Sequence, residues 1–547
     1  MSNLRTYLKK LDTALPGQLI KVKEPVDWKY GITARATQAE KTPGNPALLL
    51  ENIKGYKTPV LINLFGTIDR IHLALQDAKV GQGRLAFYSD WNRLFNNMVP
   101  PTHVKTGPVK EVINKGSKVN LESLPIPWFY PEDAGRYITA GLTAARNPTN
   151  PEEVNLTYIR MQLQGPDRFG VSLHSRGHMW QYYQQAKAND QPLEVAVILG
   201  AHPALGLAAA AKITDEYSKV GALTGEPVEL VDCETVDVPV PAQAEIILEG
   251  VMPHEEMDEG PFTEYTGYIS GRSTRNLLQI TAITSRNNPI FHAIFPNNSA
   301  EHLLLSGLPK QARITQALTQ YTHMPALKDI NWPTQGTHFI TLLSLNPAAT
   351  ATPGLPKQVA LLLLGLDHYV KIAAILPATD DVSDPSQALT AIARRCDLKH
   401  GSGLEVLGGV YSHLLDPSSP RGGLSGKMIL DATGPEIAET GAPDTTAKLR
   451  GVKGVAQPVP GVAQLLAVTA TDTLQPRTLL EAKPLKPARL IIIVDPDIDP
   501  HDPGQLLWAI ATRSQPDTDT TAQDGRLVID ARKGQDWTAK RATLPEA

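Results

Sequence analysis

The sequence predicts a multidomain protein that combines α+β and α/β organisation, and three observations lead to this prediction. The chain has 547 residues, enough for two to four domains that each have a core. A central stretch is dominated by short strand patterns, whereas the flanking regions mix strands with helices. One strand–turn–helix pattern occurs twice near the carboxy terminus. We therefore expect four parts, at residues 1–105, 106–305, 306–438 and 439–547.

Residues 1–105 are predicted to form an N-terminal α/β unit. An amphipathic helix over 4–11 precedes a strand at 18–22. The apolar runs at 47–50 and 60–63 are bounded by Gly and Pro, which is typical of buried strands. A Pro-containing hinge at 98–102 ends this unit.

The central part is predicted to be a β-barrel. Alternating patterns predict strands at 158–163, 228–231, 244–249 and 278–284, and short strands at this density favour a barrel. An Ala-rich segment at 208–211 is expected in an inserted helix. Helix signals at 310–320 lead into a C-terminal α/β domain.

We interpret the C-terminal region as a tandem duplication. Residues 371–395 and 489–513 align without a gap at an offset of 489 − 371 = 118. Identical pairs include Asp381/Asp499, Asp384/Asp502, Pro385/Pro503, Gln387/Gln505, Leu389/Leu507 and Arg395/Arg513. Each copy is predicted to be a strand, an acidic turn and a helix. The acidic turn at 495–502 lacks the Gly and closing Glu of a calcium loop, so we interpret Asp502 as a helix N-cap.

Composition excludes several classes of protein. Hydrophobic residues make up 42% and charged residues 20%, as in an ordinary globular protein, and the net charge of −4 gives no case for nucleic acid binding. Two cysteines, Cys233 and Cys396, exclude a disulfide framework. The amino terminus lacks an apolar signal core, and the longest apolar run, near 359–364, is too short to cross a membrane. We expect a cytoplasmic enzyme with no integral membrane segment.

Three charged residues form a candidate catalytic set. Glu259 and Glu264 flank a Gly-Pro turn, and Arg160 lies about a hundred residues upstream. The planar guanidinium of Arg matches a carboxylate bidentately, one Glu could orient it, and the other could act as general acid. Taken alone, a Glu pair at this spacing is more often a solvated turn. The surrounding motifs decide between the two interpretations.

Motifs along most of the chain give that context. In order, they are Leu-Arg-Thr-Tyr-Leu at 4–8, Gly-Gln-Leu-Ile-Lys-Val at 17–22, the run at 46–56, Asn-Leu-Phe-Gly-Thr at 63–67, 155–160, Arg-Gly-His at 176–178, Glu-Tyr at 216–217 ahead of Gly-Ala-Leu-Thr-Gly at 221–225, 259–264, Leu-Asp-Pro-Ser-Ser at 415–419, and 427–433. This series resembles the UbiD family of decarboxylases, which use prenylated FMN. The resemblance implies that the central part is a split β-barrel that binds the flavin.

The resemblance also implies a set of cofactor residues. A divalent metal, Mn²⁺ or Mg²⁺, would be held by Asn155, His178 and Glu216, and it would bind the flavin phosphate. K⁺ is a further candidate ion. Cofactor contacts are expected from Asn155, Tyr158, Ile159, Arg160, Arg176, Gly177, His178 and Glu216. For His178 and Arg176, the alternatives are an ordinary histidine and a solvent-facing charge. A cofactor-contacting Lys of the family could be either Lys357 or Lys371.

The implied activity is reversible, non-oxidative decarboxylation of an aromatic, heteroaromatic or α,β-unsaturated carboxylic acid. Arg160 would bind the departing carboxylate, Glu259 would orient Arg160, and Glu264 would return a proton to carbon. The expected partners are the acid, CO₂, a flavin prenyltransferase that supplies the cofactor, and further copies of the chain in a homo-oligomer. Two alternatives stay open: a catalytically silent subunit of a multicomponent carboxylase, and an FMN-binding split-barrel protein of other activity. Aromatic residues near Phe291, Phe295 and His302 are candidates for lining the substrate site.

Overall fold

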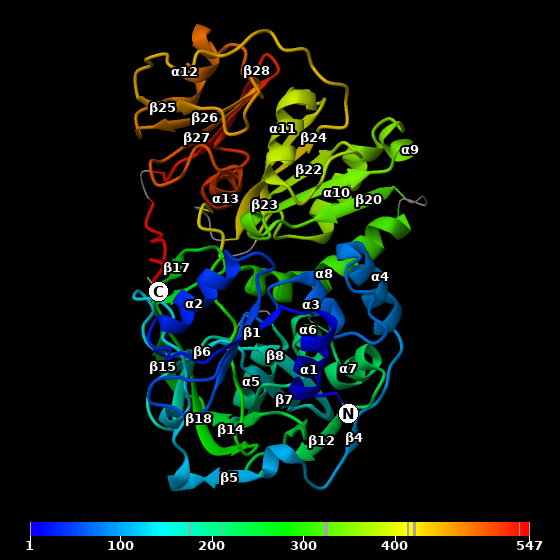
Figure 1. Cartoon of the computed structure of the whole chain (residues 1–547), viewed down its shortest axis with the longest axis vertical. Helices are drawn as coiled ribbons and strands as arrows, with labels where there is room; N and C mark the ends of the chain where they lie inside the picture. Colours follow the sequence, from blue (N-terminus) through cyan, green and yellow to red (C-terminus); the bar gives the residue numbers. More distant parts are fainter. Residues whose placement is uncertain are drawn as a thin grey trace. The chain divides into compact units, whose positions relative to one another are not determined.

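The computed structural model describes residues 2–173, 177–211, 213–321, 326–412, 415–419, 423–534 and 537–545. The chain forms two compact units. The first unit contains Met1–Ala312 and Lys540–Ala547, and the second contains Arg313–Ala539. The boundary falls inside the long helix α8 (Ala300–Tyr321) (Figure 1).

The first unit begins with a small four-stranded sheet. Its strand order is β1 (Leu19–Val22), β2 (Ala47–Leu50), β3 (Val60–Ile62) and β19 (Phe291–His292). The last strand comes from far along the chain and pairs in parallel with β3. Helix α1 (Leu4–Ala14) begins at Asn3, which forms a capping box with Thr6. The other helices of this region are α2 (Gly31–Glu40), α3 (Ile68–Leu73) and α4 (Gly83–Phe95).

A ten-stranded sheet forms the body of the first unit. Its main path is β6 (Tyr137–Ile138), β9 (Met161–Leu163), β10 (Arg168–Val171), β18 (Ser273–Ser285), β14 (Ile246–Met252), β11 (Leu193–Leu199), β7 (Leu142–Asn147) and β8 (Asn150–Tyr158). Strands β5 (Val112–Lys115) and β15 (Glu256–Glu259) also pair with the long β18. The sheet curls, and three helices accompany it: α5 (His178–Ala188), α6 (Pro203–Ala210) and α7 (Glu216–Thr224). Short pairings join β13 (Pro239–Pro241), β12 (Glu229–Asp232) and β4 (Thr102–His103), and separately β16 (Phe262–Thr263) and β17 (Ile269–Ser270).

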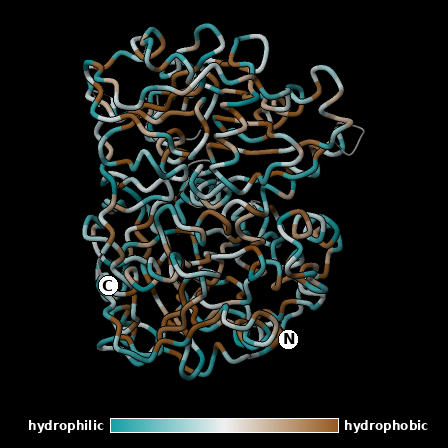
Figure 2. The backbone as a smooth tube through the Cα atoms, turned by 45° about the horizontal axis from the view of Figure 1, so that its top comes forward, coloured by the Kyte–Doolittle hydropathy of each residue, from teal (hydrophilic) through white to brown (hydrophobic). Residues whose placement is uncertain are grey.

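The second unit contains two five-stranded sheets. The first has the order β20 (Leu327–Asn331), β21 (Ile340–Leu345), β22 (Ile372–Leu376), β24 (Leu424–Asp431) and β23 (Leu404–Tyr411). The second has the order β25 (Val452–Ala456), β26 (Leu465–Ala470), β27 (Leu490–Val494), β29 (Arg526–Ala531) and β28 (Thr520–Gln523). The helices here are α9 (Pro347–Thr350), α10 (Leu355–Leu366), α11 (Pro385–Arg395), α12 (Pro476–Glu481) and α13 (Pro503–Arg513). The central strands β22 and β27 are buried along their whole length, and the backbone coloured by hydropathy shows hydrophobic segments running through the interior (Figure 2).

Several sequence predictions are confirmed by these elements. The predicted strand at 490–494 is β27, and all five of its residues are buried, so both faces are covered as expected. Asp502 caps α13 by accepting hydrogen bonds from the backbone N–H groups of Gly504 and Gln505. Among the described residues, no helix is long and apolar enough to cross a membrane. The architecture is mixed α/β and multidomain, as predicted, while the four-part division remains a prediction.

One predicted strand is wrong. The alternation at 158–163 predicted a continuous strand, but β8 ends at Tyr158 and β9 begins at Met161. The interruption has a local cause, because the backbone N–H of Ile159 donates to the carbonyl of Gly141 outside the ladder. Arg160 therefore lies in a break between two strands. The alternation of side chains along a strand does not determine the direction of its side chain there.

Candidate active site

Arg160 is held by the two glutamates that the sequence singled out. Its Nε and Nη2 atoms donate to the two carboxylate oxygens of Glu259, at 2.8 and 2.9 Å. Its Nη1 atom donates to Glu264. The face of the guanidinium lies over the Phe262 ring, 5.1 Å from the ring centroid. Residues about a hundred positions apart in the sequence thus form one charged cluster.

A sharp turn presents the two glutamates to Arg160. Glu259 is the last residue of β15, and Glu264 directly follows the short strand β16. Gly260 between them has φ +90°, and a Cβ atom there would come within 2.8 Å of the Gly271 carbonyl. Only glycine fits this position without strain. The sequence Glu-Gly-Pro-Phe-Thr-Glu therefore places both carboxylates beside one guanidinium.

Burial strengthens the attraction between the charges of this cluster. Glu259 is fully buried, whereas the side chains of Glu264 and Arg160 are 11% and 20% exposed. Burial lowers the pKa of Arg160, but Glu264 and Glu259 outweigh it and hold the pKa above its ordinary value. Arg160 therefore stays charged. An Arg side chain has five N–H donors, and the contacts to Glu259 and Glu264 engage three of them.

A second cluster contains the three predicted metal ligands. Asn155 lies on β8, Glu216 is the first residue of α7, and His178 is the first residue of α5. The Nδ2 atom of Asn155 donates to Oε1 of Glu216 at 2.8 Å and lies 3.3 Å from Nδ1 of His178. The structure thus brings together an amide, a carboxylate and an imidazole from three separate elements.

Two buried oxygen atoms in this second cluster are candidates for a cation. Oδ1 of Asn155 and Oε2 of Glu216 are buried and accept no hydrogen bond from any described residue. Burial raises the pKa of Glu216 to about 8, so its carboxylate lacks stabilisation by a nearby positive charge. These oxygens and an imidazole suit a hard or intermediate divalent ion. Among the described residues, no group of three or more His, Cys, Asp or Glu side chains is placed to hold a metal ion, and the set here has two such side chains and the amide of Asn155.

The remaining predicted cofactor residues follow the same strand and helix. The hydroxyl end of Tyr158 points toward α6, where a Cβ on Gly206 would come within 2.4 Å of it, and burial raises its pKa. The cofactor contact of Tyr158 remains a prediction. Ile159 is buried, and Gly177 is the N-cap residue of α5. Arg176 lies outside the described residues.

Sequence reasoning missed three residues that hold the Glu259–Glu264 turn. Asp133 is buried, and its Oδ1 accepts hydrogen bonds from the backbone N–H and the hydroxyl of Thr263, at 2.8 and 2.9 Å. Burial raises the pKa of Asp133 to about 7, against the effect of these hydrogen bonds. Gln162 accepts from the N–H of Gly260 at 3.1 Å, and the Tyr137 hydroxyl donates to the carbonyl of Pro261 at 3.2 Å. Only the surrounding geometry singles out these residues.

The structure also places the candidates for substrate lining and for the cofactor-contacting lysine. Phe291 and Phe295 are buried core residues, with 0% and 2% exposure. His302 has its ring edge-on to Tyr265, and burial lowers the pKa of His302 despite the nearby charge of Glu264. Lys357 pairs with Glu405, and Lys371 is completely buried in a polar network of the second unit.

Family models match almost the whole chain. The 3-octaprenyl-4-hydroxybenzoate carboxy-lyase N-terminal domain matches residues 13–84, and the Rift-related domain of the same family matches 102–299. The corresponding C-terminal domain matches 304–432 and 438–532. The chain belongs to the UbiD family. The matching family models are described as carboxy-lyase domains, so the predicted enzyme class is confirmed.

Solved structures of UbiD-class enzymes are similar over most of this chain. HmfF from Pelotomaculum thermopropionicum, in complex with FMN, is 34% identical, with a TM-score of 0.72 over 79% of this chain and 94% of that chain. An evolved dimeric form of HmfF in complex with prFMN is 31% identical, with a TM-score of 0.70 over 82% and 99%. The Klebsiella pneumoniae 3,4-dihydroxybenzoic acid decarboxylase AroY is 27% identical, with a TM-score of 0.73 over 80% and 95%.

Proposed function

We propose that this UbiD-family chain is a reversible, non-oxidative decarboxylase of an aromatic, heteroaromatic or α,β-unsaturated carboxylic acid that uses prenylated FMN and a divalent metal. The observation that carries the proposal is the partly buried Arg160, which pairs with Glu259 and with Glu264. The complexes of HmfF with FMN and prFMN support the choice of cofactor.

Arg160 binds the substrate carboxylate with the N–H donors that the glutamates leave available. Glu259 accepts hydrogen bonds from two nitrogen atoms of the guanidinium, so the guanidinium plane is fixed before the substrate binds. The substrate's own carboxylate then pairs with a donor that needs little reorganisation, which is the main benefit of a prearranged site.

Glu264 acts as the general acid. When CO₂ leaves, the bond between the carboxyl carbon and the substrate breaks, and its electron pair stays on the substrate. Bound prenylated FMN supplies an electrophilic ring system that accepts this electron density. Protonated Glu264 then donates its proton to the substrate carbon, and a proton from solvent restores the acid. Its partial exposure gives this carboxylate access to solvent.

Asn155, His178 and Glu216 would hold Mn²⁺ or Mg²⁺, and the metal would bind the flavin phosphate. The two buried oxygen atoms without a hydrogen-bond partner among the described residues support this role. The start of α5 at Gly177 adds backbone N–H groups that suit a phosphate. The role of Arg176 at this end remains a prediction.

The test is to produce the chain with and without a flavin prenyltransferase. The purified protein is examined by absorbance, by mass spectrometry of the released cofactor and by metal analysis, and a panel of aromatic and unsaturated acids is then screened for CO₂ release. We expect prenylated FMN and activity only after co-expression. Bound cofactor without CO₂ release from any acid would favour the silent-subunit alternative. Activity with ordinary FMN would favour the alternative flavoprotein.

A further inference from the structure

The two halves of the second unit have the same build. The first half contains β20 to β24 and the second contains β25 to β29. In each sheet the first and last strand pairs are antiparallel and the two central pairs are parallel. Helices α11 and α13 each contain 11 residues and follow equivalent strands, β22 and β27.

Small side-chain contacts repeat at the offset of 118 seen in the sequence. Asp384 and Asp502 cap their helices with nearly identical backbone angles, φ −99° and −102°. The amide of Gln387 donates to Asp384 at 3.2 Å, and that of Gln505 donates to Asp502 at 3.1 Å. These repeated contacts support a tandem duplication of one structural unit.

The contacts between the halves are reciprocal. Lys371, the residue before β22, donates from Nζ to the carbonyl of Ser514 at 3.0 Å. Arg489, its equivalent before β27, donates from Nη2 to the carbonyl of Cys396 at 2.8 Å. Residues 371 and 489 differ by 118, as do 396 and 514. A pair of contacts in which each half makes the same contact with the other is the signature of a two-fold interface.

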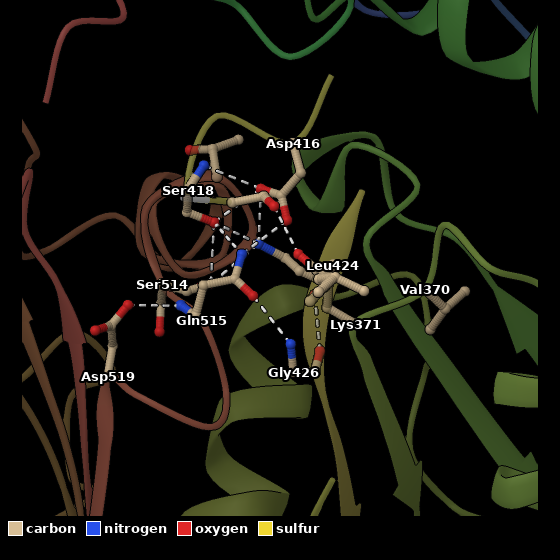
Figure 3. A network of polar contacts seen from close by, with 12 residues as sticks. Val370, Lys371, Asp416, Ser418, Leu424, Gly426, Ser514, Gln515 and Asp519 are labelled. Atoms are coloured by element: carbon tan, nitrogen blue, oxygen red, sulfur yellow. Dashed lines mark hydrogen bonds and ion pairs between the residues drawn. The ribbon is translucent and has the colours of Figure 1, made fainter. Parts of the chain in front are cut away.

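The interface between the halves is buried and hydrogen-bonded. Lys371 is fully buried, and Ser514 and Gln515 are 2% and 3% exposed. Gln515 donates to Asp416 at 2.9 Å and accepts from the N–H of Gly426 at 3.1 Å (Figure 3). Helices α11 and α13 also pack against each other. Without the second half, the buried ammonium group of Lys371 would lose a hydrogen-bond acceptor.

We propose that the C-terminal unit carries a self-complementary surface, formed by α11, the residue before β22 and the chain after α11, and that the second half of the same chain occupies it. The partner of this surface is thus an internal copy of the unit and not a second subunit. Any homo-oligomer must then form through other surfaces. This inference stands independently of the proposed catalytic function.

The first experiment cuts the chain between the halves. Residues 438–442 are exposed, and protease recognition sites inserted after Thr440 and after Ala539 allow the folded protein to be cleaved on both sides of the second half. The second site is needed because residues 540–547 belong to the first unit and would otherwise hold the fragments together. We expect the two fragments to remain together in size-exclusion chromatography with light scattering, and to separate in denaturant. Separation of the fragments in native buffer would overturn the proposal.

The second experiment tests reciprocity and connectivity. In the cleaved protein, Lys371→Met and Arg489→Ala should each weaken fragment association about 10-fold or more, because each removes a charged hydrogen-bond donor. Arg477→Ala, which changes an exposed arginine of the second half, should have no effect. An effect of Arg489→Ala no larger than that of Arg477→Ala would overturn the reciprocal contact.

In the uncut protein, Arg489→Ala should not lower the mass measured by light scattering, because the contact lies within one chain. A lower mass would show that the halves pair between chains and would overturn the internal assignment. Arg489→Lys keeps the charge and should restore much of the fragment affinity, which separates loss of the contact from misfolding. Failure of this rescue in a variant that is folded by circular dichroism would count against the contact.

Discussion

At the level of single residues, Glu264 and Glu259 differ in how they meet Arg160. Glu259 is fully buried and contacts two nitrogen atoms, whereas Glu264 contacts only Nη1 and is partly exposed. This difference fits a positioning role for Glu259 and proton transfer by Glu264. We expect Glu264→Gln to reduce turnover by about 10²–10⁴-fold, since the amide cannot donate a proton in its place. Solvent deuterium incorporation at the product carbon should fall equally. Exchange at the wild-type rate would transfer the acid role to Glu259.

A substitution of Glu216 tests the proposed metal and cofactor site. Its free carboxylate oxygen is buried beside Asn155, so Glu216→Ala removes a proposed metal ligand. We expect metal affinity to fall by at least about 10–100-fold and flavin occupancy to fall with it. Glu152→Ala, on an exposed position of the same strand β8, is the matched control. Full flavin and metal content in Glu216→Ala would remove Glu216 from the site.

Asp133 shows how a residue outside the charged cluster can control it. It anchors Thr263, which directly precedes Glu264, and its other oxygen accepts from the N–H of Tyr130 at 3.1 Å. Asp133→Asn places an NH₂ group against one of these donors and should shift the turn. We expect kcat to fall by up to about 10²-fold with flavin content unchanged, as is typical when a reacting group is misplaced by about 1 Å. Glu132→Gln should leave kcat unchanged, and equal kcat in both variants would contradict a positioning role for Asp133.

At the level of elements, two neighbouring lysines are buried in the first half of the second unit: Lys371, which precedes β22, and Lys427 of β24. Lys427 precedes Met428, which pairs with Ile372, and its Nζ donates to the carbonyls of His368 and Val370. The pKa of Lys427 is lowered from 10.5 to about 8, and burial is the largest cause. Asp367 and Asp416 oppose this shift, whereas the charge of Lys371 contributes to it. At neutral pH the fold therefore contains a charged group that burial disfavours.

This burial predicts a pH dependence of stability. Between pH 8 and 10.5 the unfolded chain keeps the Lys427 proton that the folded chain has lost, so the free energy of unfolding rises with pH. Relative to Lys427→Met, the wild-type protein should gain about 3 kcal/mol over this interval, from about 2.5 pKa units at 1.36 kcal/mol each. Denaturant unfolding at pH 7, 8.5 and 10 measures the difference. Lys448→Met, at an exposed position, is the control, and parallel pH profiles for wild type and Lys427→Met would contradict the prediction.

At the level of the whole molecule, the second half of the C-terminal unit is expected to be structurally required. Truncation after residue 440 removes Ser514 and Gln515 and exposes the surface around Lys371 and Gly426. We expect the truncated protein to aggregate, because unpaired polar groups and apolar surface become exposed together. Solubility and light scattering of the purified protein measure this outcome. A soluble truncated protein with unchanged mass and activity would show that the second half is dispensable.

Local sequence patterns predicted much of this fold, and their failures have physical causes. The strand at 490–494 and the Asp502 cap were predictable because both depend on neighbouring residues. The pairing of β19 with β3 was not, since it joins segments more than 200 residues apart. The motifs predicted that Arg160, Glu259 and Glu264 act together, and the structure has them in contact. Asp133 was missed because an isolated Asp in a loop carries no periodic signal, and its role depends on a distant turn.

The covalent link between the two matching halves has a consequence for dilution. Two separate subunits joined by these contacts would dissociate as protein concentration falls. Within one chain, the roughly 20 residues between β24 and β25 keep the halves at an effective concentration in the millimolar range. The association therefore does not depend on how much protein is present, and this interface should not make the thermal midpoint vary with concentration. An enzyme built this way keeps its C-terminal architecture even when only a few copies are made.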